Sequence, residues 1–293
     1  MVLGFNARAS HQIVDITHCL LLDPALLALL APLRPVLHHC VEGSGGDVVM
    51  TLAENGVDLL IEAPARLDLF DREMLSHFAN THDLARLSWR RPGDGMIEPL
   101  AARRPPVLRF GGMAVTPAPG GFLQPSPEGE AALVGLVEAA LTGITRPVAD
   151  LFAGCGSFSL PLTLRRPVHA VEGDDAALRA LKATLSATPG LRLTVERRDL
   201  THNPLAGEEL KRFAAVVFDP PRTGAAEQAR ALAQHGPAVV VAVSCNPATL
   251  ARDLRILTVG GYQIERITPV DQFPWSAHLE AVAVLRRAQT GIF

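Results

Sequence analysis

Strands and helices alternate along the second part of the chain, from about residue 119 to the end. Apolar runs that are typical of buried strands lie at 147–152, 168–173, 191–200, 213–221 and 238–247, and helical patterns separate them. Two further strands are expected at 262–273 and 278–287. This alternation favours a parallel sheet covered by helices on both faces. We therefore predict an α/β domain over residues 119–293.

The first part of the chain has a different pattern. We expect a helix over 23–37, opened by Asp23, then a hairpin over 47–63 that turns at "ENG", a helix over 68–82 and a strand over 84–90. Residues 90–106 are rich in glycine and proline and are expected to form turns. This pattern predicts a smaller N-terminal α+β domain over residues 1–118, with an accessory, RNA-binding role.

Composition sets limits on the class of protein. Of the 293 residues, 48% are hydrophobic and 19% are charged, which is typical of a folded globular protein. No apolar run is long enough for a membrane span and the start lacks a secretory signal, so we expect no membrane partner and a cytoplasmic location. The net charge of −3 means that a nucleic acid would have to be bound by local basic patches. The candidates are Arg86/Arg90/Arg91, Arg103/Arg104, Arg165/Arg166, Arg197/Arg198 and Lys211/Arg212. The alternative is that these residues only make an exposed face soluble, which is the more frequent role of paired arginines.

The four cysteines are Cys19, Cys40, Cys155 and Cys245. They are widely spaced, with no close pair that could coordinate a metal ion, so no metal site is expected. Each is either a small buried residue or a reactive thiol.

Unusual residues gather where the predicted strands end, which is where ligands bind in sheets of this kind. Gly154 and Gly156 allow a tight turn after the first strand, and Glu172 follows the second strand, where a carboxylate can bind ribose hydroxyls. The third glycine of the dinucleotide fingerprint is missing, which disfavours a diphosphate. The pattern favours S-adenosylmethionine as the cofactor, although an ordinary strand–helix turn is the alternative. The next strands end at Asp199, Asp219 and Cys245.

The stretch "FDPPRTGA" ends the fourth strand. Methyltransferases that act on amino nitrogens often carry an aromatic residue after the two prolines, whereas this chain has Arg222. Cys245 ends the next strand, at a helix start that is expected to lower the pKa of its thiol. A thiolate that adds to C6 of uracil would activate C5 for methylation, and Glu280 or His278 would then remove the C5 proton. The alternatives are an inert, packed Cys245 and a Glu280 that is only a strand-edge charge.

The motifs "DLFAGCGSFSLPL", "VEGDDAAL", "FDPPRTGA", "VSCNPATLARDL" and "DQFPWSAHLEAVAVL", in this order, resemble the bacterial RNA uracil-5 methyltransferase family, which modifies 23S rRNA or tRNA. The resemblance implies a Rossmann-like class I methyltransferase domain. It implies that Cys245 is the nucleophile, that Glu280 is the base and that Asp219 lies at the junction of cofactor and base. The positions it implies for cofactor binding are Gln124, Phe152, Gly154, Ser157, Glu172, Asp199 and Asp219.

The expected activity is S-adenosylmethionine-dependent methylation of uracil C5 in RNA, in 23S rRNA rather than tRNA. The alternatives are a tRNA enzyme, a truncated non-catalytic RNA-binding homologue, and methylation of an amino nitrogen or a small molecule. Many ribosomal members of the family begin with an RNA-binding barrel and a cysteine cluster that holds an iron–sulfur centre. Cys19 resembles the last ligand of that cluster, but the other ligands are missing from this chain, so no iron–sulfur cluster is expected.

Overall fold

The computed structural model describes residues 1–7, 10–41, 43–276 and 278–287. They form two compact units, Met1–Leu108 with Thr116–Gly121, and Arg109–Val115 with the chain from Phe122 onward. The chain thus changes unit more than once between residues 108 and 122, and the domain boundary expected after residue 118 stays a prediction. Among the described residues, no helix is both long and apolar enough to cross a bilayer.

The first unit is built around a mixed sheet of four strands in the order β3-β4-β5-β6. Its elements are β1 (Gly4–Asn6), β2 (Ile13–Asp15), α1 (Pro24–Cys40), β3 (Asp47–Ala53), β4 (Gly56–Glu62), α2 (Leu69–Thr81), β5 (Arg86–Arg90) and β6 (Ile97–Ala102). The side chain of Asp23 caps α1 by accepting the N–H of Ala25, as the sequence predicts. Leu33, Leu59 and Trp89 are among the residues of the core between the helices and this sheet.

Strand β6 lies in the stretch that we expected to be rich in turns, where no strand was predicted. It pairs antiparallel with β5, from Arg86↔Ala102 to Arg90↔Ile97, with an irregularity between Leu87 and Ser88. Because β6 is an edge strand, Pro99 can be accommodated within it. Tertiary pairing therefore overrides the turn propensity of this segment.

The second unit contains a seven-stranded sheet in the order β11-β10-β9-β12-β13-β15-β14. Its strands are β9 (Val148–Leu151), β10 (Val168–Glu172), β11 (Leu193–Arg197), β12 (Ala215–Phe218), β13 (Val239–Ser244), β14 (Tyr262–Val270) and β15 (Glu280–Arg287). The first five pair in parallel, and β15 inserts antiparallel between β13 and β14. The parallel α/β sheet predicted from the sequence is confirmed, and a short hairpin of β7 (Leu108–Phe110) and β8 (Met113–Val115) precedes it.

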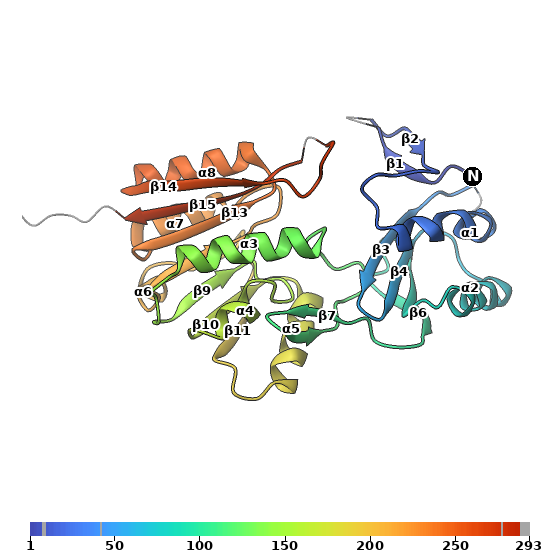
Figure 1. The fold of residues 1–293 in the computed structure, drawn as a ribbon, viewed down its shortest axis with the longest axis horizontal. Coiled ribbons are helices and arrows are strands. Elements are labelled where there is room, and N and C mark those ends of the chain that lie inside the picture. The colour runs from blue at the N-terminus through green and yellow to red at the C-terminus, as the bar shows by residue number, and fades with distance from the viewer. Residues whose placement is uncertain (8–9, 42, 277, 288–293) are drawn as a thin grey trace, which may run out of the picture. The chain divides into compact units, whose positions relative to one another are not determined.

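Helices cover both faces of this sheet (Figure 1). They are α3 (Pro127–Ala140), α4 (Ser159–Thr163), α5 (Asp175–Ala187), α6 (Glu208–Lys211), α7 (Ala226–His235) and α8 (Pro247–Val259). Val216 and Phe218 of β12 pack in one core cluster with Leu232 of α7 and Leu254 of α8. Since side chains alternate along a strand, Ala215 and Val217 point to the opposite face.

Helix α4 follows the glycine turn. Gly154 and Gly156 have φ values of +57° and +105°, which no α-helix contains, so these residues form the turn and not the helix. The helix begins only at Ser159.

Candidate active site

The carboxyl ends of β9, β10, β12 and β13 lie at one edge of the parallel sheet and bring most of the predicted site residues together. The backbone N–H of Asp219 donates to Leu151 O at 3.3 Å, so the segments after β9 and β12 stay in contact beyond the last strand pair. The candidate active site therefore lies where these parallel strands end.

Glu172 organises the glycine turn. Its two carboxylate oxygens accept hydrogen bonds from the backbone N–H of Gly154 at 2.8 Å and of Asp174 at 2.7 Å. A Cβ added at Gly154 would meet no atom within 4 Å, whereas one at Gly156 would lie 2.7 Å from the side chain of Leu181. Gly156 is thus needed for packing, while Gly154 borders open space beside the Glu172 carboxylate.

The other predicted cofactor positions after β9 flank this turn. Phe152 is half-buried and has a φ of +61°, a conformation that is unusual for a side chain of its size. Ser157 is also half-buried. Together with Gly154 and Glu172, these residues present an apolar ring, a hydroxyl, a carboxylate and free space, which suits a nucleoside with an attached amino acid.

Asp199 follows β11 at the edge of the sheet. Its carboxylate accepts hydrogen bonds from the backbone of Thr201 at 3.0 Å and from His202 Nδ1 at 2.7 Å. The bond to His202 lowers the pKa of Asp199 below its usual value. Both of these hydrogen bonds are thus made within its own exposed loop, and neither of them reaches another predicted site residue.

Asp150, at the end of β9, was not predicted as a site residue. It is fully buried, and Ser159 Oγ donates to its Oδ2 at 2.5 Å, while its Oδ1 has no partner among the described residues. Burial, aided by the charge of Glu172, raises the pKa of Asp150 to about 7. The signal in the sequence was an acidic residue inside the apolar run "VADLF".

Gln124 connects Asp219 to a distant part of the chain. Its Nε2 donates to Asp219 Oδ2 at 3.3 Å, and Gln272 Nε2 donates to Gln124 Oε1 at 2.9 Å. Burial and the charges of Glu280 and Asp150 raise the pKa of Asp219 to about 8. At neutral pH the free protein therefore holds a proton on this carboxyl group more readily than an exposed aspartate would.

The strand register brings Cys245 and Glu280 together. Strands β13 and β15 pair antiparallel from Val239↔Arg286 to Ser244↔Ala281, so Cys245 directly follows the last pair on one strand and Glu280 directly precedes it on the other. Glu280 is 5% exposed, and burial raises its pKa while Arg222 opposes the shift. A thiol and a carboxyl group that can hold a proton thus meet at the end of neighbouring strands.

The expected effect of the helix start on Cys245 is wrong. Burial and the carboxylates of Glu280 and Asp219 raise the pKa of this thiol, and the charge of Arg222 only partly offsets them. The prediction considered only the position of Cys245 before α8 and did not include charges from two other strands. The thiol of the free protein is therefore protonated at neutral pH.

Helix α8 holds the loop that follows β12. Asn246 Nδ2 and Thr249 Oγ1 both donate to Arg222 O, at 3.0 and 3.2 Å. One turn later, Arg252 donates to Thr223 O at 3.0 Å and Asp253 accepts the N–H of Ala225 at 2.7 Å. Sequence reasoning missed these residues, although polar side chains at positions 246, 249 and 253 lie on one face of a helix.

His278, the second candidate for the base, is exposed, and its ring lies 5.9 Å from that of Phe273 in an edge-on contact. Of the other cysteines, Cys40 and Cys155 are buried, and desolvation raises the pKa of each to about 12. Neither group is suited to act as a nucleophile.

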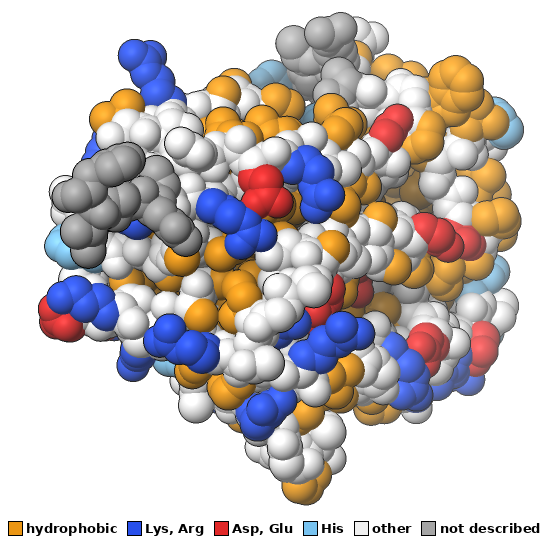
Figure 2. Space-filling view, turned by 60° about the vertical axis from the view of Figure 1, so that its left-hand side comes forward, with side chains coloured by type: hydrophobic (Ala, Val, Ile, Leu, Met, Phe, Trp, Pro, Cys, Tyr) orange, Lys and Arg blue, Asp and Glu red, His pale blue; other side chains and the backbone are white. Residues whose placement is uncertain are grey.

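Most of the candidate basic patches are neutralised by ion pairs. The pairs are Arg86–Asp58, Arg90–Glu62, Arg91–Asp94, Arg103–Asp83, Arg104–Asp83, Arg166–Glu138, Arg197–Asp175, Arg198–Glu209 and Lys211–Glu208. Figure 2 shows basic side chains spread over one face of the molecule, several of them beside acidic ones. Because their charges are paired with acidic side chains, these basic residues do not form a continuous positive surface for a nucleic acid.

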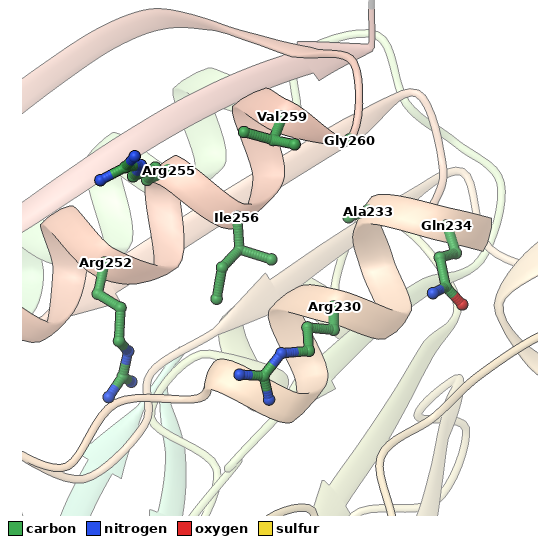
Figure 3. A pocket seen from close by; sticks show the side chains of 8 residues that line it. All are labelled: Arg230, Ala233, Gln234, Arg252, Arg255, Ile256, Val259 and Gly260. Atoms are coloured by element: carbon green, nitrogen blue, oxygen red, sulfur yellow. The ribbon is translucent and has the colours of Figure 1, made fainter.

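A groove of about 420 Å³ lies between α7 and α8 (Figure 3). Its lining combines apolar side chains such as Ile256 and Val259 with Arg230, Arg252 and Arg255. None of the predicted site residues lines it, so this groove is separate from the candidate active site.

Among the described residues, no group of three or more His, Cys, Asp and Glu side chains is arranged to hold a metal ion. Cys19 is half-buried, and its Sγ accepts the N–H groups of Leu21 and Leu22 at 3.4 Å.

Three comparisons place the chain among known proteins. The family model described as tRNA (uracil-5-)-methyltransferase matches residues 113–288. An uncharacterized RNA methyltransferase of Brucella suis is 46% identical over 291 residues, which cover 99% of this chain and 68% of that protein. The 23S rRNA (uracil(1939)-C(5))-methyltransferase of Aeromonas hydrophila is 34% identical over 294 residues, covering 97% of this chain and 65% of that protein.

A solved structure agrees with the fold. The Pyrococcus abyssi tRNA (uracil-54, C5)-methyltransferase, in complex with S-adenosyl-L-homocysteine, superposes with a TM-score of 0.74 at 21% identity, over 97% of this chain and 72% of that one. The Rossmann-like class I methyltransferase fold predicted from the sequence is confirmed.

Proposed function

The chain belongs to the tRNA (uracil-5-)-methyltransferase family and is an S-adenosylmethionine-dependent RNA methyltransferase, and from this we propose that it forms 5-methyluridine in 23S rRNA with Cys245 as nucleophile and Glu280 as base. The observation that supports the proposal is the β13–β15 register, whose last pair, Ser244↔Ala281, adjoins both Cys245 and Glu280, together with the effect of the charges of Glu280 and Asp219 on the Cys245 thiol. An inert packed cysteine has no need of a buried carboxyl group as its neighbour.

S-adenosylmethionine, when bound, supplies an electrophilic methyl group. The residues we propose to hold it are those around the glycine turn and the adjoining strand ends, namely Gln124, Phe152, Gly154, Ser157, Glu172, Asp199 and Asp219. The open space at Gly154, bounded by the Glu172 carboxylate, supports this assignment. Asp219 is held by Gln124 and interacts with Glu280, which supports a place for it between cofactor and base.

The reaction begins at C6 of the uracil ring. Cys245 gives up its proton to solvent water, and the thiolate forms a bond from Sγ to C6, which turns the ring into an enolate with a nucleophilic C5. After C5 has gained its methyl group, Glu280 accepts the C5 proton. The electrons of that C–H bond re-form the C5–C6 double bond, and the Cys245 thiolate leaves.

The charges around Cys245 suit these reaction steps. The raised pKa of Glu280 favours proton uptake, because its buried carboxylate is more basic than an exposed one. Arg222 lowers the pKa of both Cys245 and Glu280 and thereby favours their charged forms. We propose that the positive charge of Arg222 stabilises the Cys245 thiolate, which the negative charges of Glu280 and Asp219 would otherwise destabilise.

The choice of 23S rRNA over tRNA is supported by the Aeromonas hydrophila relative, which is named as a 23S rRNA enzyme and is aligned with 97% of this chain. The tRNA enzyme of Pyrococcus abyssi resembles the chain at the level of fold only. Mapping 5-methyluridine in 23S rRNA and in tRNA from cells without the gene tests this choice. Loss of the modification from tRNA alone would contradict it.

Substitution of the two proposed catalytic residues tests the mechanism. Cys245→Ala should reduce methyl incorporation into RNA by at least 10⁴-fold, because the unactivated C5 is a poor nucleophile. Glu280→Gln should methylate but fail to eliminate, so that a protein–RNA adduct survives denaturing electrophoresis. Cys19 is a half-buried cysteine of the first unit. Its replacement, Cys19→Ala, is the matched control and should keep full activity. Full activity of Cys245→Ala would exclude the covalent route.

A further inference from the structure

A second pocket of about 590 Å³ lies entirely within the first unit and contains none of the proposed catalytic residues. It is bounded by the segment before α2, by α2 itself, by β5 and by the β5–β6 connection, and its walls include Arg66, Trp89, Arg91 and Met96. Its volume is in the range of small-molecule and cofactor sites.

Two buried hydrogen-bond donors in the walls of this pocket lack partners. Trp89 is 2% exposed, and its Nε1 has no hydrogen-bond partner among the described residues; the same holds for Nε of Arg91. A buried indole N–H usually finds an acceptor. Because indole and guanidinium groups only donate, what is missing at both atoms is an acceptor.

The charges of the pocket leave one cation unpaired. Arg72 donates to the carboxylate of Glu98 at 2.8 Å, and Arg91 pairs with Asp94 at 2.9 Å. Arg66 is exposed and has no ion pair among the described residues. The pocket therefore offers two unsatisfied donors and a free positive charge.

Apolar surface accompanies these donors. Met96 is 78% exposed, and Leu67, Ile97 and Pro99 also line the pocket. An inorganic anion alone would not need such walls, whereas a nucleotide combines an apolar ring face, carbonyl acceptors and a phosphate.

We propose that this pocket binds a second nucleobase of the RNA substrate, one with a carbonyl oxygen that accepts from Trp89 Nε1, while Arg66 binds the adjoining phosphate. This inference rests on the proposed function only in taking RNA as the partner. It assigns to the first unit a defined contact with one unpaired nucleotide.

The indole N–H signal of Trp89 provides a direct test. The chain has two tryptophans, so Trp275→Phe leaves Trp89 as the single indole in a ¹H–¹⁵N spectrum. We expect GMP and UMP, added to millimolar concentration, to shift this signal, AMP to shift it less because adenine lacks a carbonyl, and inorganic phosphate to leave it in place. A signal that no nucleotide moves, or that phosphate moves as far as GMP, would overturn the inference.

Affinity measurements provide the second test. Trp89→Phe keeps a ring but removes the donor, and Arg66→Gln removes the charge without touching the core; each should weaken binding of single-stranded RNA about tenfold. Binding of S-adenosylmethionine should not change. Arg192→Gln, an exposed arginine next to the start of β11, is the matched control and should bind RNA as the wild type does.

The two proposals fail separately. If both variants bind RNA like the wild type while the wild type methylates RNA, the pocket assignment is wrong and the proposed function stands. If the Trp89 signal responds to nucleotides but the wild type methylates no RNA, the pocket assignment stands and the proposed function is wrong.

Discussion

Asp253 on α8 accepts a hydrogen bond at 2.7 Å from the backbone N–H of Ala225, in the loop that follows β12. Asp253 is 1% exposed, so this bond is made away from water. Since the same loop begins with Asp219 and contains Arg222, the position of two charged groups of the proposed active site depends on a residue of the neighbouring helix.

Removing this bond should loosen the loop. Asp253→Ala leaves the Ala225 N–H buried without an acceptor, and we expect the free energy of unfolding in urea to fall by about 2 kcal/mol. The turnover number should fall while the affinity for S-adenosylmethionine stays unchanged. Asp253→Asn, which keeps an acceptor oxygen, should restore most of both. Arg255→Ala, an exposed residue of the same helix, should change stability by less than about 0.5 kcal/mol. Equal losses in the two alanine variants would contradict the anchoring role.

The raised pKa of Cys245 predicts how fast iodoacetamide modifies this thiol. Because only the thiolate reacts, the rate should rise with pH and reach its midpoint above the ordinary cysteine pKa of about 8.5. Glu280→Gln removes a nearby negative charge, so the midpoint should move to lower pH, whereas Arg222→Gln should move it higher.

Mass spectrometry of the Cys245 peptide measures this rate at each pH. Cys19, modified in the same samples, serves as the internal control, because no shift of its rate is expected from either substitution. A Cys245 midpoint that ignores both substitutions would mean that the three side chains do not interact.

Local patterns in the sequence were sufficient for most of the second unit. The alternation of apolar runs and helices predicted the parallel sheet, and its strand ends carry Glu172, Asp219 and Cys245 as expected. The β6 strand was missed because its pairing with β5 outweighs the turn propensity of residues 90–106.

Interactions between residues far apart in the chain were not predictable in the same way. The proximity of Cys245 to Glu280 depends on a strand register between segments that a whole helix and a strand separate. The direction of the thiol pKa was wrong for that reason, since the charges that set it come from other strands. The ion-pair partners of the candidate basic patches were not predictable either, because residues such as Asp58, opposite Arg86, lie in a neighbouring strand.

Asp150 should make stability depend on pH. Its pKa is raised by burial to about 7 in the folded protein and is near the ordinary aspartate value of about 3.9 when unfolded. Between these values the folded state holds a proton that the unfolded state has lost, so stability decreases as pH rises from about 4 to 7. Asp150→Asn removes this effect and should reduce the difference in unfolding free energy between pH 5 and pH 8 by about 2–4 kcal/mol.

Urea denaturation of both proteins at the two pH values measures the effect of Asp150. Some dependence should remain in the variant, because burial also raises the pKa of Glu130 to about 7 and that of Asp219 to about 8. An unchanged pH dependence in Asp150→Asn would show that Asp150 is ionised at little cost in the folded protein.

The ion pair of Arg86 and Asp58 should be important for the stability of the first unit. Asp58 is 3% and Arg86 15% exposed in their side chains, and Arg86 also donates to Pro117 O at 2.9 Å. Arg86→Ala leaves a buried, unpaired carboxylate and should lower the free energy of unfolding by about 3–5 kcal/mol. Adding Asp58→Leu should recover part of this loss, because the second change removes that charge. Arg230→Ala, which breaks an exposed pair with Glu227 on α7, is the control and should cost less than about 1 kcal/mol. Urea unfolding of the wild type and the three variants measures these losses. A double variant that is less stable than Arg86→Ala would show that groups other than Arg86 also stabilise the Asp58 carboxylate.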